Sequence, residues 1–305
     1  MRVAIVGAGA MGGVIGFYLA AVADVVLVDP WAEHVAAITA AGLSCEREGE
    51  VRVRPVRAVS DPALVGPCEA AIVLVKARQT PWAAAACQVL LAPGAVAYTL
   101  QNGVGNREAL AAELGEARVG QGVTALGGTL LGPGRVRHAG MGLTTLGSAP
   151  DRARAEELAS LLTAAGLPAE VSDDVEALLW GKLVVNVGIN ALTALLRVPN
   201  GALADIPVAR ELMAAAVGEA AAVAAARGVR LPYDDPVAHV EAVARATGAN
   251  RSSMLQDVLR GAATEVAVIN GAVVHEGARL GVPTPLNAAL LALVEALDAT
   301  AAQRV

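Results

Sequence analysis

Residues 2–12 read Arg2-Val-Ala-Ile-Val-Gly-Ala-Gly-Ala-Met-Gly12, a short apolar run followed by three glycines in the spacing G-x-G-x-x-G. The β-branched run predicts a buried strand, and residues 13–21 predict a helix directly after the glycines. In this setting the glycines permit a tight turn, close approach of a pyrophosphate to backbone N–H groups, and close packing of helix on strand. The stretch therefore predicts a dinucleotide-binding turn; the alternative is a glycine-rich turn without a nucleotide. The candidate cofactor contacts are Gly7, Ala8, Gly9, Ala10, Met11 and Gly12.

A second apolar run, residues 24–28, ends in Asp29, which lies twenty positions after Gly9. An acid at the end of the second strand accepts hydrogen bonds from the ribose hydroxyls of NAD, and its charge repels the 2′-phosphate of NADP. No Lys or Arg lies between residues 24 and 46 to neutralise such a phosphate. The residues therefore favour NADH, with Trp31 as a candidate for stacking on adenine.

Strand and helix patterns continue to alternate along the first half: a strand at 70–75, a helix at 82–90, a strand at 95–100 and a helix from about 106. This order predicts a doubly wound parallel sheet whose ligands lie beyond the carboxyl ends of the strands. Lys76 and Asn102 follow two of those strands and are candidate ligand contacts. The alternatives are a solvated loop lysine and an Asn-Gly turn. Residues 118–125, 135–138 and 143–146 predict an antiparallel edge or hairpin, with His138 as a strand residue rather than a catalyst.

The second half carries helical patterns at 175–196, 208–227, 236–246, 253–259, 264–280 and 286–301. The predicted fold class is α/β: an N-terminal Rossmann-type doubly wound parallel sheet followed by an all-helical C-terminal domain. We expect a dinucleotide-binding domain at residues 1–172 and a helical substrate-binding domain at residues 173–305.

Within the first of these helices, Lys182, Asn186 and Asn190 recur at four-residue intervals in an otherwise apolar run. Four residues advance a helix by about 400°, so the three side chains share one face. Burying an amide or ammonium group costs several kcal/mol unless it is hydrogen-bonded, and a bound polar ligand would satisfy the row. The alternative is that Lys182 extends to water while the asparagines cap neighbouring backbone. Glu265 is either a site residue or a first-turn acid that favours its helix dipole.

The composition indicates a globular protein with a small-molecule partner. The 305 residues are 55% hydrophobic with a net charge of −6 and a pI near 5.3, so no basic surface for nucleic acid or an anionic membrane is expected. Three cysteines without C-x-x-C spacing suggest reduced cytosolic thiols, and no metal site emerges from them and the four histidines. The glycine spacing argues against a signal peptide. We expect a cytoplasmic protein, with a homodimer through its helical half as one possibility.

Taken in order, a set of short motifs resembles the ketopantoate reductase family, the 2-dehydropantoate 2-reductases, over the whole chain. The motifs are Gly7-x-Gly9-x-x-Gly12, Val75-Lys76, Gln101-Asn102-Gly103, Gly122-Val-Thr124, Gly134-x-Val136-x-His138, Trp180-x-Lys182-Leu183-x-x-Asn186-x-x-x-Asn190, Pro199-Asn200-Gly201, Ser252-Ser253-Met254-x-x-Asp257 and Thr264-Glu265-x-x-x-Ile269-Asn270-Gly271. The resemblance implies reduction of a 2-oxo acid by NADPH between a Rossmann domain and a helical domain. The implied reaction converts 2-dehydropantoate to (R)-pantoate in the synthesis of pantothenate and coenzyme A.

The resemblance also implies roles for individual residues. Lys182 is the implied general acid, and Glu265 lies with Lys76 and Asn102 around the nicotinamide and its ribose. The implied substrate contacts are Asn186, Asn190, Asn200 and Ser253. The chemistry agrees, because hydride addition to a ketone develops alkoxide charge that an ammonium group stabilises and protonates.

Two departures from the family pattern leave alternatives open. Asp29-Pro-Trp31 stands where the family usually has a basic residue for the 2′-phosphate, and Gly261-Ala-Ala-Thr-Glu265-Val-Ala267 lacks the usual Arg and Asp. One alternative is an NAD-dependent dehydrogenase for another branched D-2-hydroxy acid, such as D-mandelate. A second alternative, from a different class, is a non-catalytic NAD(P)-binding redox sensor.

Overall fold

The computed structural model describes residues 1–303. The chain divides into two compact units, one made of Met1–Gln101 and Asn106–Val175, the other of Asn102–Gly105 and the residues from Glu176 onward. The second predicted domain runs to residue 305, so its last two residues lie outside the described part of the chain. The short segment Asn102–Gly105 lies between two parts of the first unit in sequence, yet it groups with the second unit.

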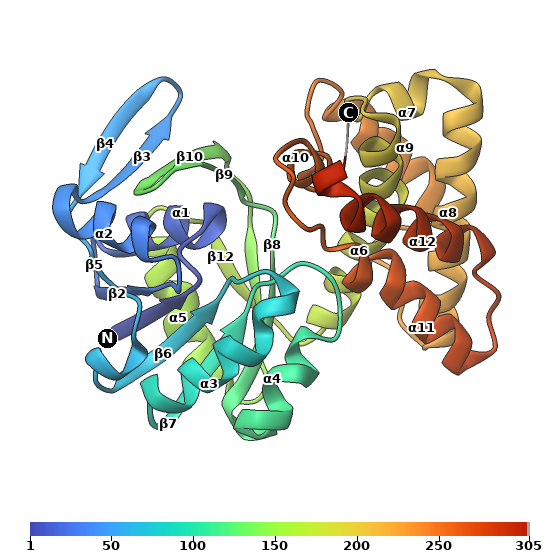
Figure 1. Ribbon diagram of the computed structural model, residues 1–305. Coiled ribbons are helices and arrows are strands. Elements are labelled where there is room, and N and C mark those ends of the chain that lie inside the picture. The colour runs from blue at the N-terminus through green and yellow to red at the C-terminus, as the bar shows by residue number, and fades with distance from the viewer. Residues whose placement is uncertain (304–305) are drawn as a thin grey trace. The chain divides into compact units, whose positions relative to one another are not determined.

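The first unit is built on an eight-stranded sheet with the order β12-β11-β8-β7-β6-β1-β2-β5 (Figure 1). All neighbours are parallel except β8 and β11. Because β2 and β6 flank β1 on opposite sides, the winding reverses beside β1, which is where such sheets bind ligands. The predicted Rossmann-type sheet is confirmed. Its strands are β1 (Arg2–Val6), β2 (Asp24–Val28), β5 (Arg57–Val59), β6 (Cys68–Val73), β7 (Leu91–Thr99), β8 (Val119–Thr124), β11 (Thr144–Gly147) and β12 (Ala169–Ser172).

Helices cover both faces of this sheet, because its strands are apolar on both sides. In β1, Val3 and Ile5 pack in one core with residues of α1 and α5, whereas Ala4 and Val6 pack in a second core with residues of α3 and α4. This alternation follows from the two-residue period of a strand. The helices are α1 (Ala10–Leu19), α2 (Ala32–Ala41), α3 (Thr80–Leu90), α4 (Asn106–Leu114) and α5 (Arg152–Ala164), with 3₁₀ turns η1 (Pro62–Leu64), η2 (Ala77–Gln79) and η3 (Glu116–Arg118).

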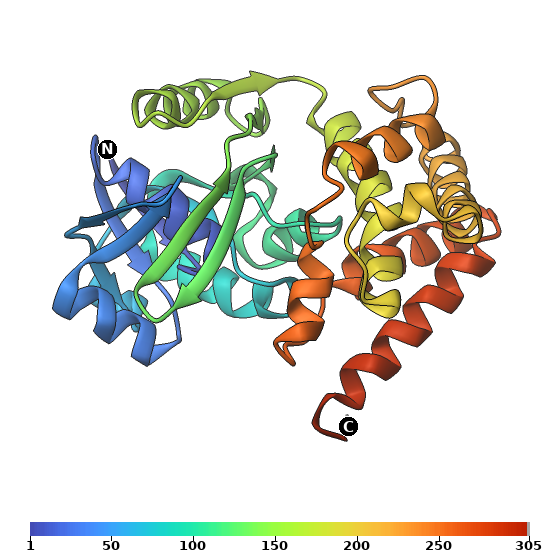
Figure 2. The ribbon, with the colours of Figure 1, turned by 90° about the horizontal axis from the view of Figure 1, so that it is seen from above.

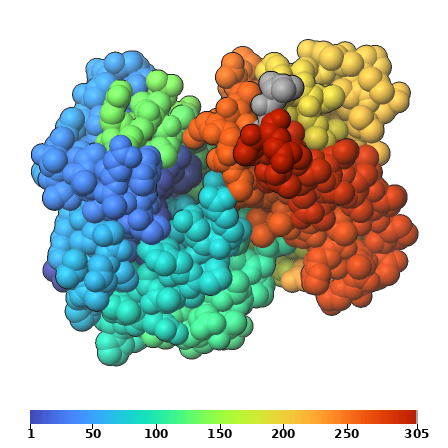
Figure 3. All heavy atoms as spheres, in the orientation of Figure 1, coloured from blue at the N-terminus to red at the C-terminus, as the bar shows by residue number. Residues whose placement is uncertain are grey.

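A second, four-stranded sheet in the first unit was not predicted. It has the order β4-β3-β10-β9, formed by β3 (Leu43–Arg47), β4 (Glu50–Arg54), β9 (Gly127–Gly132) and β10 (Arg135–Gly140). Parallel pairing of β3 with β10 joins residues about ninety positions apart, which local patterns do not reveal. Figure 3 shows the green atoms of the β9–β10 hairpin beside blue atoms of the N-terminal region. Residues 118–125 and 143–146 instead pair antiparallel in the large sheet, as β8 and β11.

The second unit is helical, as predicted, and its helices can be followed from yellow-green to red in Figure 2. They are α6 (Val175–Leu196), α7 (Ala202–Asp205), α8 (Pro207–Ala226), α9 (Pro236–Ala246), α10 (Ser253–Leu259), α11 (Asn270–Leu280) and α12 (Pro285–Ala299), with 3₁₀ turns η4 (Val266–Val268) and η5 (Ala301–Gln303). The prediction of one helix over 264–280 is wrong. A 3₁₀ turn precedes α11, with the Val268 N–H donating to the Glu265 carbonyl and the Ile269 N–H to the Val266 carbonyl, both at 3.2 Å. The backbone of Ile269, at φ −108° and ψ −89°, then lies outside the helical range and separates this turn from α11.

Helix α6 is the core of the second unit. Among residues 1–303 it is the single helix long and apolar enough to cross a membrane, but 72% of its most apolar window is buried inside the protein. Gly188 lies against two other helices, since a Cβ there would be 2.6 Å from a methyl of Val217 and 2.9 Å from one of Val240. The apolar residues of α6 therefore pack inside the unit.

Candidate functional site

The glycine turn between β1 and α1 has the geometry that a pyrophosphate requires. Gly7 has φ +97°, and a Cβ on it would lie 2.7 Å from the Val75 nitrogen. A Cβ on Gly12 would lie 1.8 Å from the Gly7 oxygen, so no side chain fits there. Gly9 is the N-cap of α1 without a side-chain hydrogen bond, and a Cβ on it meets nothing within 4 Å. The first N–H groups of a helix lack intrahelical partners, so the open space beside Gly9 at the amino end of α1 fits the pyrophosphate of a dinucleotide.

Asp29 braces this turn from the end of β2. The Ala8 N–H donates to Asp29 Oδ2 at 2.7 Å, and the Trp31 N–H donates to Asp29 Oδ1 at 2.9 Å. These two bonds fix the carboxylate, while each oxygen keeps a second lone pair for a ribose hydroxyl. Sequence reasoning predicted a contact of Asp29 with the ligand but not its support of the turn.

Lys76 follows β6 in a segment held by a buried glutamine. Gln101, 6% exposed, donates through Nε2 to the Val75 carbonyl at 3.0 Å and to Thr80 Oγ1 at 2.9 Å. Since Gly7 packs against the Val75 nitrogen, the structure brings Lys76 to the neighbourhood of the glycine turn. Sequence reasoning noted Gln101 only as a polar residue at a strand end; its partners are recognisable only in three dimensions.

Lys182 and Glu265 interact in the second unit. Burial lowers the pKa of the Lys182 ammonium group to about 8, and the charge of Glu265 acts in the opposite direction. Glu265 is 8% exposed and precedes η4, so it is a buried carboxylate rather than the first-turn acid of a long helix. A buried ammonium that is protonated near neutral pH and releases its proton slightly above it suits general acid catalysis.

Asn102 joins this pair because its segment packs on η4. A Cβ on Gly103 would lie 2.2 Å from the Val268 oxygen, and the Val104 N–H donates to that same oxygen at 3.3 Å. As a result, Asn102 Nδ2 lies 3.5 Å from Glu265 Oε2. Asn102 and Glu265 are 163 positions apart in sequence, and the fold brings their side chains together.

The asparagines of α6 carry amides that the protein itself does not satisfy. Asn190 is 5% exposed, and within residues 1–303 neither its side-chain amide nor that of Asn186 has a hydrogen-bond partner. Asn200, 7% exposed, donates to Thr247 Oγ1 at 2.9 Å, but its Oδ1 is buried without a partner. The buried, unpaired oxygen of Asn200 costs free energy unless a ligand or a water molecule pairs with it.

Two hydroxyls, one on Ser252 and one on Thr193, link α10 to α6. Ser252 caps α10 by accepting from the Leu255 N–H at 3.1 Å, and its Oγ lies 2.7 Å from Thr193 Oγ1 of α6. The Asn200 N–H donates to the Asn250 carbonyl at 3.0 Å. The start of α10, where Ser253 is exposed, therefore lies beside the second half of α6, and Asn250 just before α10 lies beside Asn200. Sequence reasoning did not single out Thr193, although a threonine in an otherwise apolar helix could have indicated a buried hydrogen bond.

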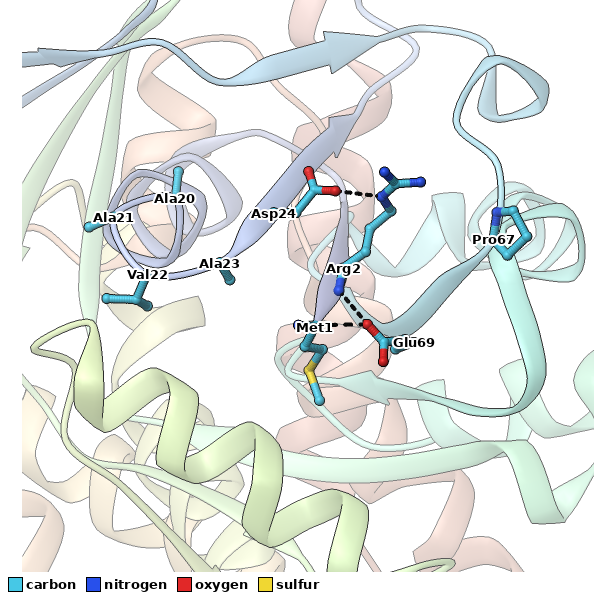
Figure 4. Close-up of a pocket in the computed structure, with 9 residues that line it drawn as sticks. All are labelled: Met1, Arg2, Ala20, Ala21, Val22, Ala23, Asp24, Pro67 and Glu69. Atoms are coloured by element: carbon cyan, nitrogen blue, oxygen red, sulfur yellow. Dashed lines mark hydrogen bonds and ion pairs between the residues drawn. The ribbon is translucent and has the colours of Figure 1, made fainter.

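A hollow of ≈ 680 Å³ at the amino ends of β1 and β2 does not offer comparable chemistry (Figure 4). Its charges pair with one another: Arg2 Nε lies 2.7 Å from Asp24 Oδ2, and the Met1 amino group lies 3.7 Å from Glu69 Oε2. No group of three or more metal-ligating side chains occurs in the described part of the chain.

The chain matches two family models almost end to end. The model described as "Ketopantoate reductase PanE/ApbA" matches residues 3–151, and "Ketopantoate reductase PanE/ApbA C terminal" matches residues 174–298. A 2-dehydropantoate 2-reductase from Halobacterium salinarum is 36% identical over 298 residues, covering 96% of this chain and 98% of its own.

Solved structures agree with this likeness. A PanE/ApbA family ketopantoate reductase from Ralstonia eutropha has a TM-score of 0.92 and 37% identity, covering 99% of this chain and 100% of its own. D-mandelate dehydrogenase with NADH and anilino(oxo)acetate has a TM-score of 0.91 and 30% identity, covering 99% of each chain. The protein is thus a member of the ketopantoate reductase family of NAD(P)-dependent oxidoreductases.

Proposed function

We propose that this enzyme transfers hydride from NAD(P)H to the 2-oxo group of 2-dehydropantoate and forms (R)-pantoate. The observation that carries the proposal is the interaction of the desolvated Lys182 ammonium with the buried Glu265, in the unit that also holds the buried, unpaired Oδ1 of Asn200. Relatives named 2-dehydropantoate 2-reductase match this chain over nearly their whole length, and they support the same substrate.

Lys182 is the proposed general acid. The ketone oxygen gains negative charge as hydride adds to its carbon, and a nearby ammonium both stabilises that charge and donates the proton. Glu265 keeps Lys182 protonated by its charge. Asn186, Asn190, Asn200 and Ser253 are the proposed contacts of the substrate carboxylate and hydroxyl, because amides and a hydroxyl supply both donors and acceptors.

The first unit is the proposed binding site of the adenosine and pyrophosphate parts of the dinucleotide. We assign its pyrophosphate to the glycine turn, residues 7–12, and its adenosine ribose to Asp29; Lys76, Asn102 and Glu265 are assigned to the nicotinamide half. When bound, the reduced nicotinamide supplies the hydride. We also propose a cytoplasmic location, supported by three buried free cysteines, and a homodimer that size-exclusion chromatography would test.

A second candidate function is oxidation of another branched D-2-hydroxy acid with NAD. Two observations favour it: Asp29 at the ribose position, and the likeness to D-mandelate dehydrogenase, which was solved with NADH. A redox sensor without turnover is less well supported, because the Lys182–Glu265 interaction is intact.

Steady-state kinetics on a panel of substrates distinguishes these functions. We expect the highest kcat/KM with 2-dehydropantoate among branched 2-oxo acids, including benzoylformate, and the reverse reaction is measured on the matching D-2-hydroxy acids. A higher kcat/KM for benzoylformate would select the second function. Dinucleotide binding without turnover of any compound would select the sensor.

The cofactor preference follows from Asp29, and we propose NADH. A carboxylate a few ångströms from a phosphate dianion costs a few kcal/mol at an effective dielectric near 20, and about 1.4 kcal/mol corresponds to tenfold in affinity. We expect kcat/KM to be at least about tenfold higher with NADH than with NADPH, and Asp29→Ser to narrow that ratio. Glu33→Gln on the exposed face of α2 is the matched control for charge alone. A tenfold preference of the wild-type enzyme for NADPH would contradict the argument.

A further inference from the structure

One histidine of α2 is buried completely and has both ring nitrogens engaged. His34 is 0% exposed; its Nε2 lies 3.0 Å from the Ala8 carbonyl oxygen, and its Nδ1 lies 3.0 Å from the Gly134 nitrogen. The Gly134 N–H can only donate, so Nδ1 accepts and carries no proton. The proton of the neutral ring therefore sits on Nε2 and is donated to Ala8.

Asp29 and His34 together hold the backbone of Ala8, one at its N–H and the other at its carbonyl. The N–H of Ala8 donates to Asp29 at 2.7 Å and its carbonyl accepts from His34, so neither group is left to rotate. Ala8 stands between Gly7 and Gly9, and glycines on both sides otherwise give a turn wide conformational freedom. The two contacts thus determine the direction of the N–H groups at the start of α1.

The other side of His34 is anchored by the β9–β10 turn. Gly134 has φ +70°, and a Cβ on it would lie 3.1 Å from the Ala37 Cβ, so only glycine brings its N–H close to α2. The hydrogen bonds of His34 therefore join three separate segments of the first unit: the glycine turn, α2 and the small sheet.

The same ring supports Trp31, which lies beside Asp29. The rings of Trp31 and His34 are stacked with centroids 5.1 Å apart and planes 10° from parallel. Trp31 is 38% exposed, and its backbone N–H donates to Asp29. In this stack, part of the Trp31 indole ring stays exposed to solvent beside the Asp29 carboxylate.

We infer that His34 is a positioning residue for the dinucleotide: it fixes the Ala8 carbonyl so that the α1 N–H groups face the pyrophosphate, and it holds Trp31 against the adenosine half. This inference rests on the proposed function. It predicts that His34 determines affinity for the cofactor without taking part in hydride or proton transfer.

Two substitutions separate the hydrogen bonds from the ring. His34→Phe keeps an aromatic ring against Trp31 but loses both hydrogen bonds, leaving the Ala8 carbonyl and the Gly134 N–H unpaired. We expect Kd for NADH and for ADP-ribose, measured by calorimetry, to rise at least about tenfold, because an unpaired buried group costs about 1–3 kcal/mol. His34→Gln offers a donor and an acceptor and should restore most of that affinity. The KM for the oxo acid and kcat at saturating NADH should change less than about twofold in both variants.

His239→Gln is the matched control. His239 is also stacked on an aromatic ring, Tyr233, with centroids 4.0 Å apart, but both belong to the second unit. Its substitution should leave Kd for ADP-ribose unchanged. A folded His34→Phe variant that binds ADP-ribose as tightly as wild type would overturn the inference.

A measurement on the unaltered protein covers the case in which His34→Phe does not fold. In ¹⁵N spectra of histidine-labelled wild type, His34 should be protonated on Nε2, and its signals should shift on saturation with ADP-ribose but not with the oxo acid. A ring protonated on Nδ1, or His34 signals that do not shift with ADP-ribose, would also overturn the inference. Wild-type protein that binds neither NADH nor ADP-ribose would refute the proposed function itself.

Discussion

The chain uses arginine almost everywhere a cation is needed, and its two lysines are both candidate site residues. Lys and Arg total 23, of which only Lys76 and Lys182 are lysines. Arginine scarcely releases a proton, whereas a lysine shifts its pKa readily when buried. Retention of lysine at position 182 fits a group that must give up a proton.

The first prediction concerns Lys182→Ala. We expect kcat to fall on the order of 10²–10⁴-fold with a smaller change in KM for the oxo acid, the usual effect of removing a positioned acid. Lys182→Arg should lower kcat as well, because the arginine keeps the positive charge but scarcely releases a proton. Stopped-flow measurement of NADH oxidation provides the rate, and a variant with more than a third of wild-type kcat would exclude Lys182 as the acid.

The second prediction is the pH dependence that follows from burial of Lys182. Burial lowers the folded-state pKa from the model-compound value of 10.5 to about 8, so the acid form is lost as pH rises through about 8. We expect kcat/KM for reduction to fall tenfold per pH unit above that value, and oxidation of the hydroxy acid to rise over the same interval. A flat reduction profile up to pH 10 would contradict this assignment.

The titration can also be observed directly, because there are so few amines. Reductive methylation with ¹³C-formaldehyde labels the N-terminus, Lys76 and Lys182, and three resonances suffice to follow each group. The resonance missing from Lys182→Arg should titrate near pH 8. In Glu265→Gln it should titrate at lower pH, since the charge that favours the ammonium is gone.

At the scale of elements, the end of α12 holds the segment that carries Glu265. Asp298 Oδ2 accepts from the Thr264 N–H at 2.9 Å and from Thr264 Oγ1 at 2.7 Å. Its Oδ1 is buried without a partner. An aspartate in the last turn of α12 thus holds Thr264, which directly precedes the proposed catalytic carboxylate of Glu265.

The third prediction is that Asp298→Ala lowers kcat about tenfold or more and destabilises the fold by about 1–3 kcal/mol, because it leaves a backbone N–H unpaired and Glu265 unsupported. Asp235→Ala removes the same kind of bond, a carboxylate accepting from the Ala238 N–H at 2.9 Å at the start of α9. This control should lose about 1 kcal/mol of stability at unchanged kcat. Equal kcat losses in both variants would mean that Asp298 acts through stability alone.

At the scale of the molecule, the chain has two units with separate cores. The clusters of buried residues around β1 and around α6 share no member. Under the proposed function, the dinucleotide and the oxo acid are bound chiefly by different units. Each ligand should therefore stabilise its own unit first.

The fourth prediction is that NADH at 100 times its Kd stabilises the first unit by about 2.7 kcal/mol, which corresponds to roughly 5–10 °C in its unfolding midpoint. Hydrogen exchange should slow at the start of α1 with NADH and along the second half of α6 with the oxo acid. The oxo acid alone, added without NADH, is the control for the first unit. Protection of α1 by the oxo acid and not by NADH would reverse the assignment.

The sequence by itself determined the features that depend on neighbours along the chain. The strand, glycine turn and helix at the N-terminus, the helical second half and the polar face of α6 all follow from spacings shorter than a single element. The prediction of a helix over residues 264–269 was wrong, because a 3₁₀ turn and the non-helical backbone of Ile269 precede α11.

The tertiary structure alone decided the contacts that span long stretches of chain. It paired β3 with β10, brought Asn102 to Glu265 across 163 positions, and set His34 against Ala8 and Gly134, which are 26 and 100 positions away. Such contacts form only when distant segments have already packed, because closing long loops costs entropy that local propensity does not repay. For that reason the sequence could name candidate residues for the chemistry, whereas only the fold shows which contacts hold them in place.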